Sequence, residues 1–124
     1  MSSISRFEEL NCWKKARELA NSVYDLSSAV PFTKDHALSQ QIRRAAGSSM
    51  HNIAEGSHSG TNPEFIRFPK MSRRSASEFQ SQLYLALDRG YITEAQLEET
   101  YELSTSVKKL INGLIGYLNR SQKP

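Results

Sequence analysis

The stretch Gln41-Ile-Arg-Arg-Ala-Ala-Gly-Ser-Ser-Met-His-Asn-Ile-Ala-Glu-Gly-Ser57 decides how this chain folds. Its apolar and small residues recur at three- and four-residue steps, which places them on one side of a helix. The pattern predicts a helix over residues 37–57 with a core face of Leu38, Ile42, Ala45, Ala46, Ser49 and Ile53. Gly56 and the Ser-, Gly- and Pro-containing segment after it end this helix and form a turn.

Three further helices are predicted around this stretch, over residues 9–29, 62–88 and 93–120. Val30-Pro31 ends the first, because the residue before a proline avoids helical geometry. Thr61-Asn-Pro-Glu64 and Thr93-Glu-Ala-Gln96 are capping-box patterns that begin the other two. The predicted core face of the 9–29 helix is Cys12, Trp13, Ala16, Leu19, Ala20, Val23 and Leu26. That of the 62–88 helix is Phe65, Phe68, Ser72, Ser75, Phe79, Leu83 and Ala86. That of the 93–120 helix is Leu97, Thr100, Leu103, Ser104, Val107, Leu110, Ile111, Leu114 and Leu118.

Four helices with short connections predict an all-α fold, an antiparallel up-down-up-down four-helix bundle that forms a single domain over residues 1–124. Pro69 lies inside the third helix, where proline costs about 3 kcal/mol, so we expect a bend or local break near Phe65–Pro69. The N-terminus has no apolar stretch like a signal peptide, and no apolar run approaches the roughly 20 residues that span a bilayer. We therefore expect a cytoplasmic protein.

The excess positive charge lies in the middle of the chain, where residues 36–82 hold six Arg/Lys against three Glu. A row of cations at helical spacing is formed by Arg67, Lys70, Arg73 and Arg74. Such a row predicts electrostatic binding to a phosphate backbone with weak sequence specificity. Tyr84 and Ile66 lie near it without forming the aromatic ladder that stacks bases. The alternative is a solvated face with an Arg74–Glu78 ion pair.

A second face of the 37–57 helix lies opposite its core face and consists of Arg43, Gly47, Met50 and Ala54. A glycine inside a helix costs about 1 kcal/mol relative to alanine, and close packing of another chain is one compensation. A small and partly apolar face of this kind predicts a contact between subunits. The alternative is a scatter of surface residues with no common role.

A polar strip runs beside the core face and consists of Gln41, Arg44, Ser48, Asn52 and Glu55, with Ser75 and Glu78 within reach on the next helix. Buried polar groups need partners, so the strip predicts a structural network of hydrogen bonds and ion pairs that sets helix register. A catalytic carboxylate pair is the alternative, but no nucleophile or activating partner accompanies the carboxylates. No catalytic residue is therefore predicted.

The segment Glu55-Gly-Ser-His58 matches one Glu-x-x-His motif of di-iron bundles, which raises the alternative of a metal site. A di-iron site needs this motif on two helices, and only one copy is present, at a helix end. We predict no metal and no cofactor. Cys12 is the single cysteine, which excludes an intrachain disulfide, and its core position predicts a packed thiol.

Several motifs together resemble one known family, and they span residues 7 to about 118. They are Leu10-Asn-Cys-Trp13 with Ala16, Pro31, Gln41-Ile-Arg-Arg-Ala-Ala46, Asn52-Ile-Ala-Glu-Gly-Ser57, Glu64-Phe-Ile-Arg-Phe68, Ser75-Ala-Ser-Glu78 and Gly90-Tyr91. The chain resembles the four-helix-bundle proteins encoded within intervening sequences of bacterial 23S rRNA genes, often labelled S23 ribosomal proteins. Pro69 and Arg73-Arg74 depart from the usual pattern, and the second departure makes this chain more basic.

The resemblance implies a ring of subunits, a homopentamer, without enzymatic activity. It also implies distant similarity to the accessory proteins of diversity-generating retroelements, which work with a reverse transcriptase. Together with the basic row, this predicts a non-enzymatic homo-oligomer that binds RNA or DNA, alone or as accessory to another protein. The alternative is a protein-interaction scaffold with no nucleic-acid contact.

Overall fold

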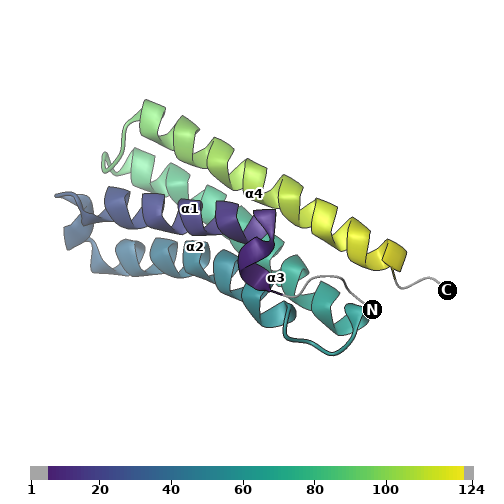
Figure 1. The fold of residues 1–124 in the computed structure, drawn as a ribbon. Helices are drawn as coiled ribbons and strands as arrows, with labels where there is room; N and C mark the ends of the chain where they lie inside the picture. The colour runs from purple at the N-terminus through teal and green to yellow at the C-terminus, as the bar shows by residue number, and fades with distance from the viewer. Residues whose placement is uncertain (1–5, 122–124) are drawn as a thin grey trace.

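A computed structural model describes residues 6–121, which form four long helices and two short 3-10 segments (Figure 1). The helices are α1 (Asn11–Ser28), α2 (His36–Gly56), α3 (Asn62–Asp88) and α4 (Glu94–Ser121), with η1 (Phe7–Glu9) before α1 and η2 (Phe32–Lys34) after it. No strand occurs within the described range, so the predicted all-α class is confirmed. The observed helix ends differ from the predicted ones by about two residues at most.

The largest difference lies at the beginning of α1. Residues 7–9 form a 3-10 segment, and Leu10 is extended with φ of −74° and ψ of 126°. The α-helix therefore begins at Asn11 and not at Glu9.

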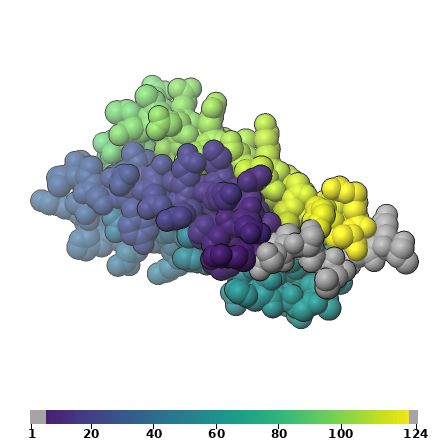
Figure 2. All heavy atoms as spheres, in the orientation of Figure 1, coloured from purple at the N-terminus to yellow at the C-terminus, as the bar shows by residue number. Residues whose placement is uncertain are grey.

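The four helices pack side by side around one apolar core (Figure 1). Helix α2 packs against α3, α3 against α4, and α1 against both α2 and α4. In the space-filling view, side chains of α1 in purple and of α4 in green and yellow meet on the face toward the viewer (Figure 2). Fully buried side chains from all four helices fill the interior, among them Leu19, Ile42, Phe79 and Leu118.

Helix α3 runs without interruption through Pro69, so the local break considered for this region does not occur. Its core line follows Phe65, Pro69, Ser72, Ala76, Phe79, Leu83 and Ala86, all of them buried. These positions alternate steps of four and three residues, so they lie along one side of the helix. That side faces the core between α2 and α4. Pro69 thus occupies a core position.

The core face of α3 therefore differs from the predicted one at a few positions. Phe68 and Ser75 are only partly buried, whereas Ile66 and Gln80 are buried. Ile66 therefore belongs to the core and does not lie beside the basic row on the surface. On α4, Ile115 joins the core, and Leu103 and Leu110 flank it.

Local signals at the helix ends take the forms expected from the sequence. At the start of α4, Thr93 N–H donates to Gln96 Oε1 at 2.9 Å, and Gln96 N–H donates to Thr93 Oγ1 at 3.1 Å, a reciprocal capping box. Gly90, with φ of 76°, takes the left-handed conformation that turns the chain from α3 toward α4. Within residues 6–121, no helix has the length and apolar character of a membrane span.

Candidate functional site

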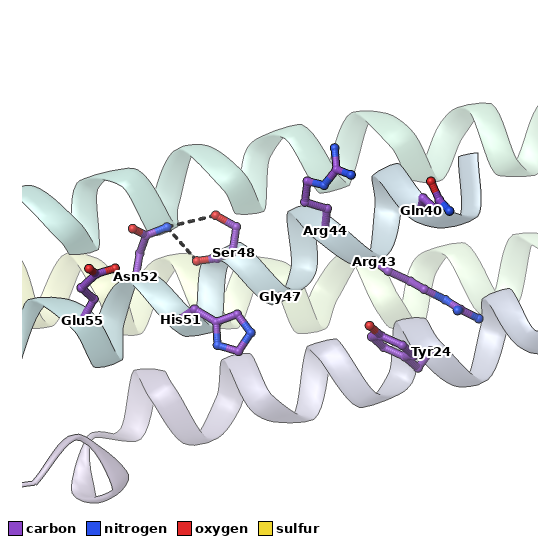
Figure 3. Close-up of a pocket in the computed structure, with 9 residues that line it drawn as sticks. All are labelled: Tyr24, Gln40, Arg43, Arg44, Gly47, Ser48, His51, Asn52 and Glu55. Carbon is purple, nitrogen blue, oxygen red and sulfur yellow. Dashed lines mark hydrogen bonds between the residues drawn. The ribbon is translucent and has the colours of Figure 1, made fainter. Parts of the chain in front are cut away.

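The outer face of α2 carries a shallow groove of about 580 Å³ that the α2 side chains line together with Tyr24 of α1 (Figure 3). Its lining residues are Tyr24, Gln40, Arg43, Arg44, Gly47, Ser48, His51, Asn52 and Glu55. Both the proposed subunit face and the polar strip contribute to this groove. It mixes cations with the carboxylate of Glu55, so its charge is not uniform.

Arg43 is held by α1 and does not project freely from this face. Its Nε donates to Ser27 Oγ at 2.7 Å, and its Nη2 donates to Ser28 Oγ at 3.3 Å. The guanidinium also lies 4.6 Å from the centre of the Tyr24 ring, a cation–π distance. Figure 3 shows Arg43 reaching toward Tyr24 while Arg44 points away from it. Arg43 therefore joins α2 to α1 within one subunit.

The other predicted interface residues occupy two kinds of position. Met50 and Ala54 are partly buried and pack against the chain's own core. Gly47 lies in the groove, where an added Cβ would meet only the His51 ring at 3.7 Å, an ordinary contact distance. Nothing within the subunit therefore requires glycine at position 47, and the role of this face in assembly stays a prediction.

The polar strip forms a short chain of hydrogen bonds between α2 and α3. Asn52 Nδ2 donates to the Ser48 carbonyl at 2.9 Å and to Ser48 Oγ at 3.0 Å, and Ser75 Oγ donates to Ser48 Oγ at 3.0 Å. The charged members lie at the surface, and no bond joins them within residues 6–121. The exposed members are the uncharged Gln41 and the charged Arg44, Glu55 and Glu78. The structure therefore bonds the strip through its serines and Asn52 and leaves its charges solvated.

A basic hollow of about 410 Å³ lies between α3 and α4, and its lining contains cations and one serine but no carboxylate. The lining residues are Lys70, Arg73, Arg74, Ser77 and Lys108. Three of the four predicted nucleic-acid-binding residues thus meet in one place. Because like charges gathered in a concave surface focus the field, this hollow attracts anions more strongly than scattered cations would.

Two of these cations are positioned by side chains of the neighbouring helix. Arg73 Nη1 donates to Asn112 Oδ1 at 2.6 Å, which connects α3 to α4. Lys108 Nζ donates to Gln80 Oε1 at 3.2 Å, which connects α4 back to α3. Each contact uses one donor of a group that has several, so donors remain for a phosphate.

The fourth predicted residue, Arg67, lies one turn before Lys70 on exposed surface, with its guanidinium 5.1 Å from the Phe68 ring centre. None of the salt bridges within residues 6–121 involves the row, and the alternative Arg74–Glu78 pair is not formed there. The row is therefore not neutralised by carboxylates of the same subunit.

Sequence reasoning missed Lys108, which comes from α4 and faces the α3 row. Its helical position, one residue past the core residue Val107, places it beside the core stripe and toward a neighbouring helix. That signal alone does not say which helix is the neighbour. The α3–α4 packing supplies the answer.

The described residues meet the requirements of neither a metal site nor a reactive cysteine. No group of three metal-binding side chains comes together in residues 6–121, and His58 packs its ring 6.0 Å from that of Phe7. Burial raises the pKa of the Cys12 thiol to about 11, which keeps it protonated and unreactive near neutral pH. The described residues thus define an all-α protein that carries a basic hollow between α3 and α4.

Comparison with known proteins places the chain more narrowly. Residues 8–113 match the model of the 23S rRNA-intervening sequence protein family, so the chain belongs to that family, as its motifs predicted. A crystal structure of a protein with unknown function from the S23 ribosomal protein family of Bacteroides thetaiotaomicron has 28% sequence identity and a TM-score of 0.78. The match covers 84% of this chain and 97% of that one. Comparison with curated proteins gave no match.

Proposed function

We propose that this protein is a non-enzymatic nucleic-acid-binding bundle that holds phosphates of RNA or DNA in the basic hollow between α3 and α4. The observation that carries the proposal is the meeting of Lys70, Arg73, Arg74 and Lys108 around one concavity without a lining carboxylate. Lys and Arg at a surface of this kind bind a phosphate backbone by releasing its counterions. Arg67 extends the same row by one turn of α3.

Binding of this type is governed by charge and reads little sequence. Phosphate contacts fix position and orientation, whereas sequence is read through base edges in the grooves. The α3–α4 hollow is lined by ammonium and guanidinium groups, with Ser77 as the single uncharged lining residue. We therefore expect affinity that falls steeply with salt and differs little between sequences.

The test compares two triple variants that remove the same charge. The first variant removes three cations from the hollow through Lys70→Ala, Arg74→Ala and Lys108→Ala. The second removes three exposed cations elsewhere through Lys14→Ala, Lys34→Ala and Arg89→Ala. Binding of a structured RNA is measured by fluorescence anisotropy at roughly 50 and 200 mM salt. We expect the first variant to lose about two to three units of salt slope and the second to keep the wild-type slope. Equal losses in both variants, or no binding by wild type at low salt, contradict the proposal.

Assembly into a homo-oligomeric ring of up-down-up-down bundles, a pentamer, is part of the proposal. It is supported by the open groove around Gly47, where the outer surface of α2 has room for another chain. A ring would repeat each basic hollow around its axis and raise the overall affinity for a long nucleic acid. Sedimentation of wild type and Gly47→Trp tests the assembly, and an unchanged oligomeric state in the variant argues against this face.

The second candidate is a protein-interaction scaffold that works without nucleic acid. A mainly apolar groove of about 360 Å³ between the start of α1 and α4 favours it, with Leu10, Leu110 and Tyr117 in its lining. A purified accessory complex, for example with a reverse transcriptase, that survives both nuclease and high salt would support this candidate. Loss of the complex under either treatment supports nucleic-acid binding.

A further inference from the structure

We propose that the α3–α4 seam is a single-strand site, in which Tyr84 stacks on a base of a strand whose phosphates occupy the basic hollow. The inference rests on the proposed function and adds the class of nucleic acid. The observation that carries it is an aromatic pair formed across the two helices that also build the hollow. The ring centres of Tyr84 and Tyr101 lie 6.0 Å apart at an interplanar angle of 72°, an edge-to-face arrangement.

Three contacts fix how the two helices run along this seam. Arg73 meets Asn112, Gln80 Nε2 donates to Thr105 Oγ1 at 3.1 Å, and Tyr84 meets Tyr101. Residue numbers rise along α3 as they fall along α4, so the basic hollow and the tyrosine pair lie on one continuous line. Gln80 and Thr105, which bond to each other between the hollow and the tyrosine pair, are uncharged.

The separation suits a short stretch of single strand. Tyr84 lies seven residues after Ser77 on α3, and Tyr101 lies seven residues before Lys108 on α4. Seven residues are close to two turns, so each tyrosine lies on nearly the same helix face as its partner in the hollow, about 10 Å further along. A strand advances about 3.4 Å per stacked nucleotide, so a base about three nucleotides from a bound phosphate reaches Tyr84.

The two rings differ in how well they are held. Tyr101 is partly buried and packs against the core, so it is a fixed support. Tyr84 is 51% exposed, and its ring meets the Tyr101 ring in an edge-to-face contact. A half-open ring next to a fixed one is available for stacking at small entropic cost, since a tyrosine side chain has two rotatable angles.

Charges around the pair limit where the backbone passes. Asp88 follows Tyr84 by one turn of α3, and Glu98 precedes Tyr101 by one turn of α4, both exposed. Lys70, Arg73, Arg74 and Lys108 lie at the opposite end. The seam therefore attracts phosphates at the hollow and repels them just beyond the tyrosines. The last contact of the strand along the seam is then a base on Tyr84 and not a phosphate.

A duplex does not satisfy this geometry. Its bases are already paired and stacked, and their faces become accessible only if the strands open. Basic grooves combined with aromatic rings that stack on successive bases are the usual form of single-strand sites. The Tyr84 contact therefore distinguishes a single strand from a duplex that meets only the cations.

The experiment measures anisotropy of labelled oligo-U and oligo-dT of about twelve nucleotides, and of a duplex of equal length. Tyr84→Leu removes the aromatic face and keeps an apolar side chain, and Tyr84→Phe keeps the ring. Leu85→Ala is the control, because Leu85 is 50% exposed on the same helix but takes no part in the tyrosine pair. We expect Tyr84→Leu to weaken single-strand binding about 5- to 100-fold with the salt slope unchanged, and Tyr84→Phe to restore it. Duplex binding should not change.

The outcomes separate this inference from the proposed function. If wild type binds nucleic acid through the hollow but Tyr84→Leu binds single strands as wild type does, the inference is wrong and the proposed function stands. A change in oligomeric state on Tyr84→Leu, seen by sedimentation, also overturns it, because the ring then serves a subunit contact. If neither single strand nor duplex binds at low salt, the proposed function itself fails.

Discussion

Two arginine pairs, Arg43-Arg44 on α2 and Arg73-Arg74 on α3, are alike in sequence and differ in their surroundings. In each pair the first arginine bonds to a neighbouring helix, Arg43 to the serines of α1 and Arg73 to Asn112 of α4. The second arginine of each pair is exposed. Up to this point the two pairs are built in the same way.

The difference lies in the charges that packing brings to each pair. Glu55 lines the groove that contains Arg44, and Glu78 lines a smaller hollow of about 160 Å³ beside it. Lys70 and Lys108 line the hollow that contains Arg73 and Arg74. An arginine pair therefore becomes an anion site only where its neighbours share its sign, and one of these neighbours, Lys108, comes from another helix.

The largest expected effect comes from making the second pair resemble the first. Lys108→Glu places a carboxylate in the hollow beside Arg73 and Arg74. We expect nucleic-acid affinity at low salt to fall by about tenfold or more, because a cation is lost and a repulsive charge is added. Lys109→Glu is the matched control, because it makes the same charge change at the adjacent residue, which does not line the hollow. Equal effects of the two variants in a binding titration would remove the distinction between the pairs.

The next effect concerns the contact between α2 and α3, the helices that carry the pairs. A Cβ at Gly56 would lie 2.8 Å from Phe68 Cβ and 3.0 Å from the Phe65 carbonyl oxygen. We expect Gly56→Ala to lower the free energy of unfolding by about 1–3 kcal/mol, because backbone and a ring must move. Urea denaturation measures it. Gly113→Ala, with nothing within 4 Å of the new Cβ, should raise it by up to about 1 kcal/mol. If Gly56→Ala unfolds with the wild-type free energy, α2 and α3 can move apart at this contact without measurable cost.

A smaller effect distinguishes the members of the first pair. Arg43→Ala removes two hydrogen bonds and a cation–π contact to α1, so we expect unfolding free energy to fall by about 1–2 kcal/mol. Arg44→Ala removes no bond and should stay within about 0.5 kcal/mol of wild type. Thermal and urea unfolding of both variants measure the difference. Equal stabilities would mean that the α1 contacts of Arg43 do not hold in solution.

The smallest effect concerns the start of α2, where Asp35 fixes the helix that carries Arg43. The Leu38 N–H and then the Tyr91 hydroxyl donate to Asp35, and they hold its pKa below the ordinary 3.8. A depressed pKa stabilises the fold above pH about 4, and this contribution is lost as pH falls through the folded-state value. Asp35→Asn keeps a capping side chain without the charge.

We therefore expect the Tm difference between wild type and Asp35→Asn to shrink between pH about 6 and about 3. Asp25→Asn on exposed α1 surface is the control, and its Tm difference should show no comparable change. A difference that grows as the pH falls has the wrong sign and contradicts the bonding described for Asp35.

The sequence predicted the helices well, because their signals are local. Leu38, Ile42 and Ile53 repeat at the period of a helix, and Thr93 with Gln96 caps one through bonds three residues apart. The error at α3, where Phe68 and Ser75 were assigned to the core in place of Pro69 and Ala76, has a local cause too. Both sets fit a helical period, and only the position of the neighbouring helices selects between them.

The candidate site was predicted in part. Lys70, Arg73 and Arg74 share one helix, so their spacing revealed them. Lys108 and Tyr101 lie on another helix, and nothing in their own spacing links them to α3. Tyr84 seemed isolated for the same reason.

By itself, then, the sequence determined four helices, their caps, the family and a basic row, since each depends on residues a few positions apart. The tertiary structure decided that Arg43 is bonded to α1, that Lys108 completes a basic hollow, and that Tyr84 meets Tyr101 beside it. The physical reason is distance along the chain. Helical period fixes which side chains share a face, whereas the meeting of two faces depends on packing between residues far apart in sequence.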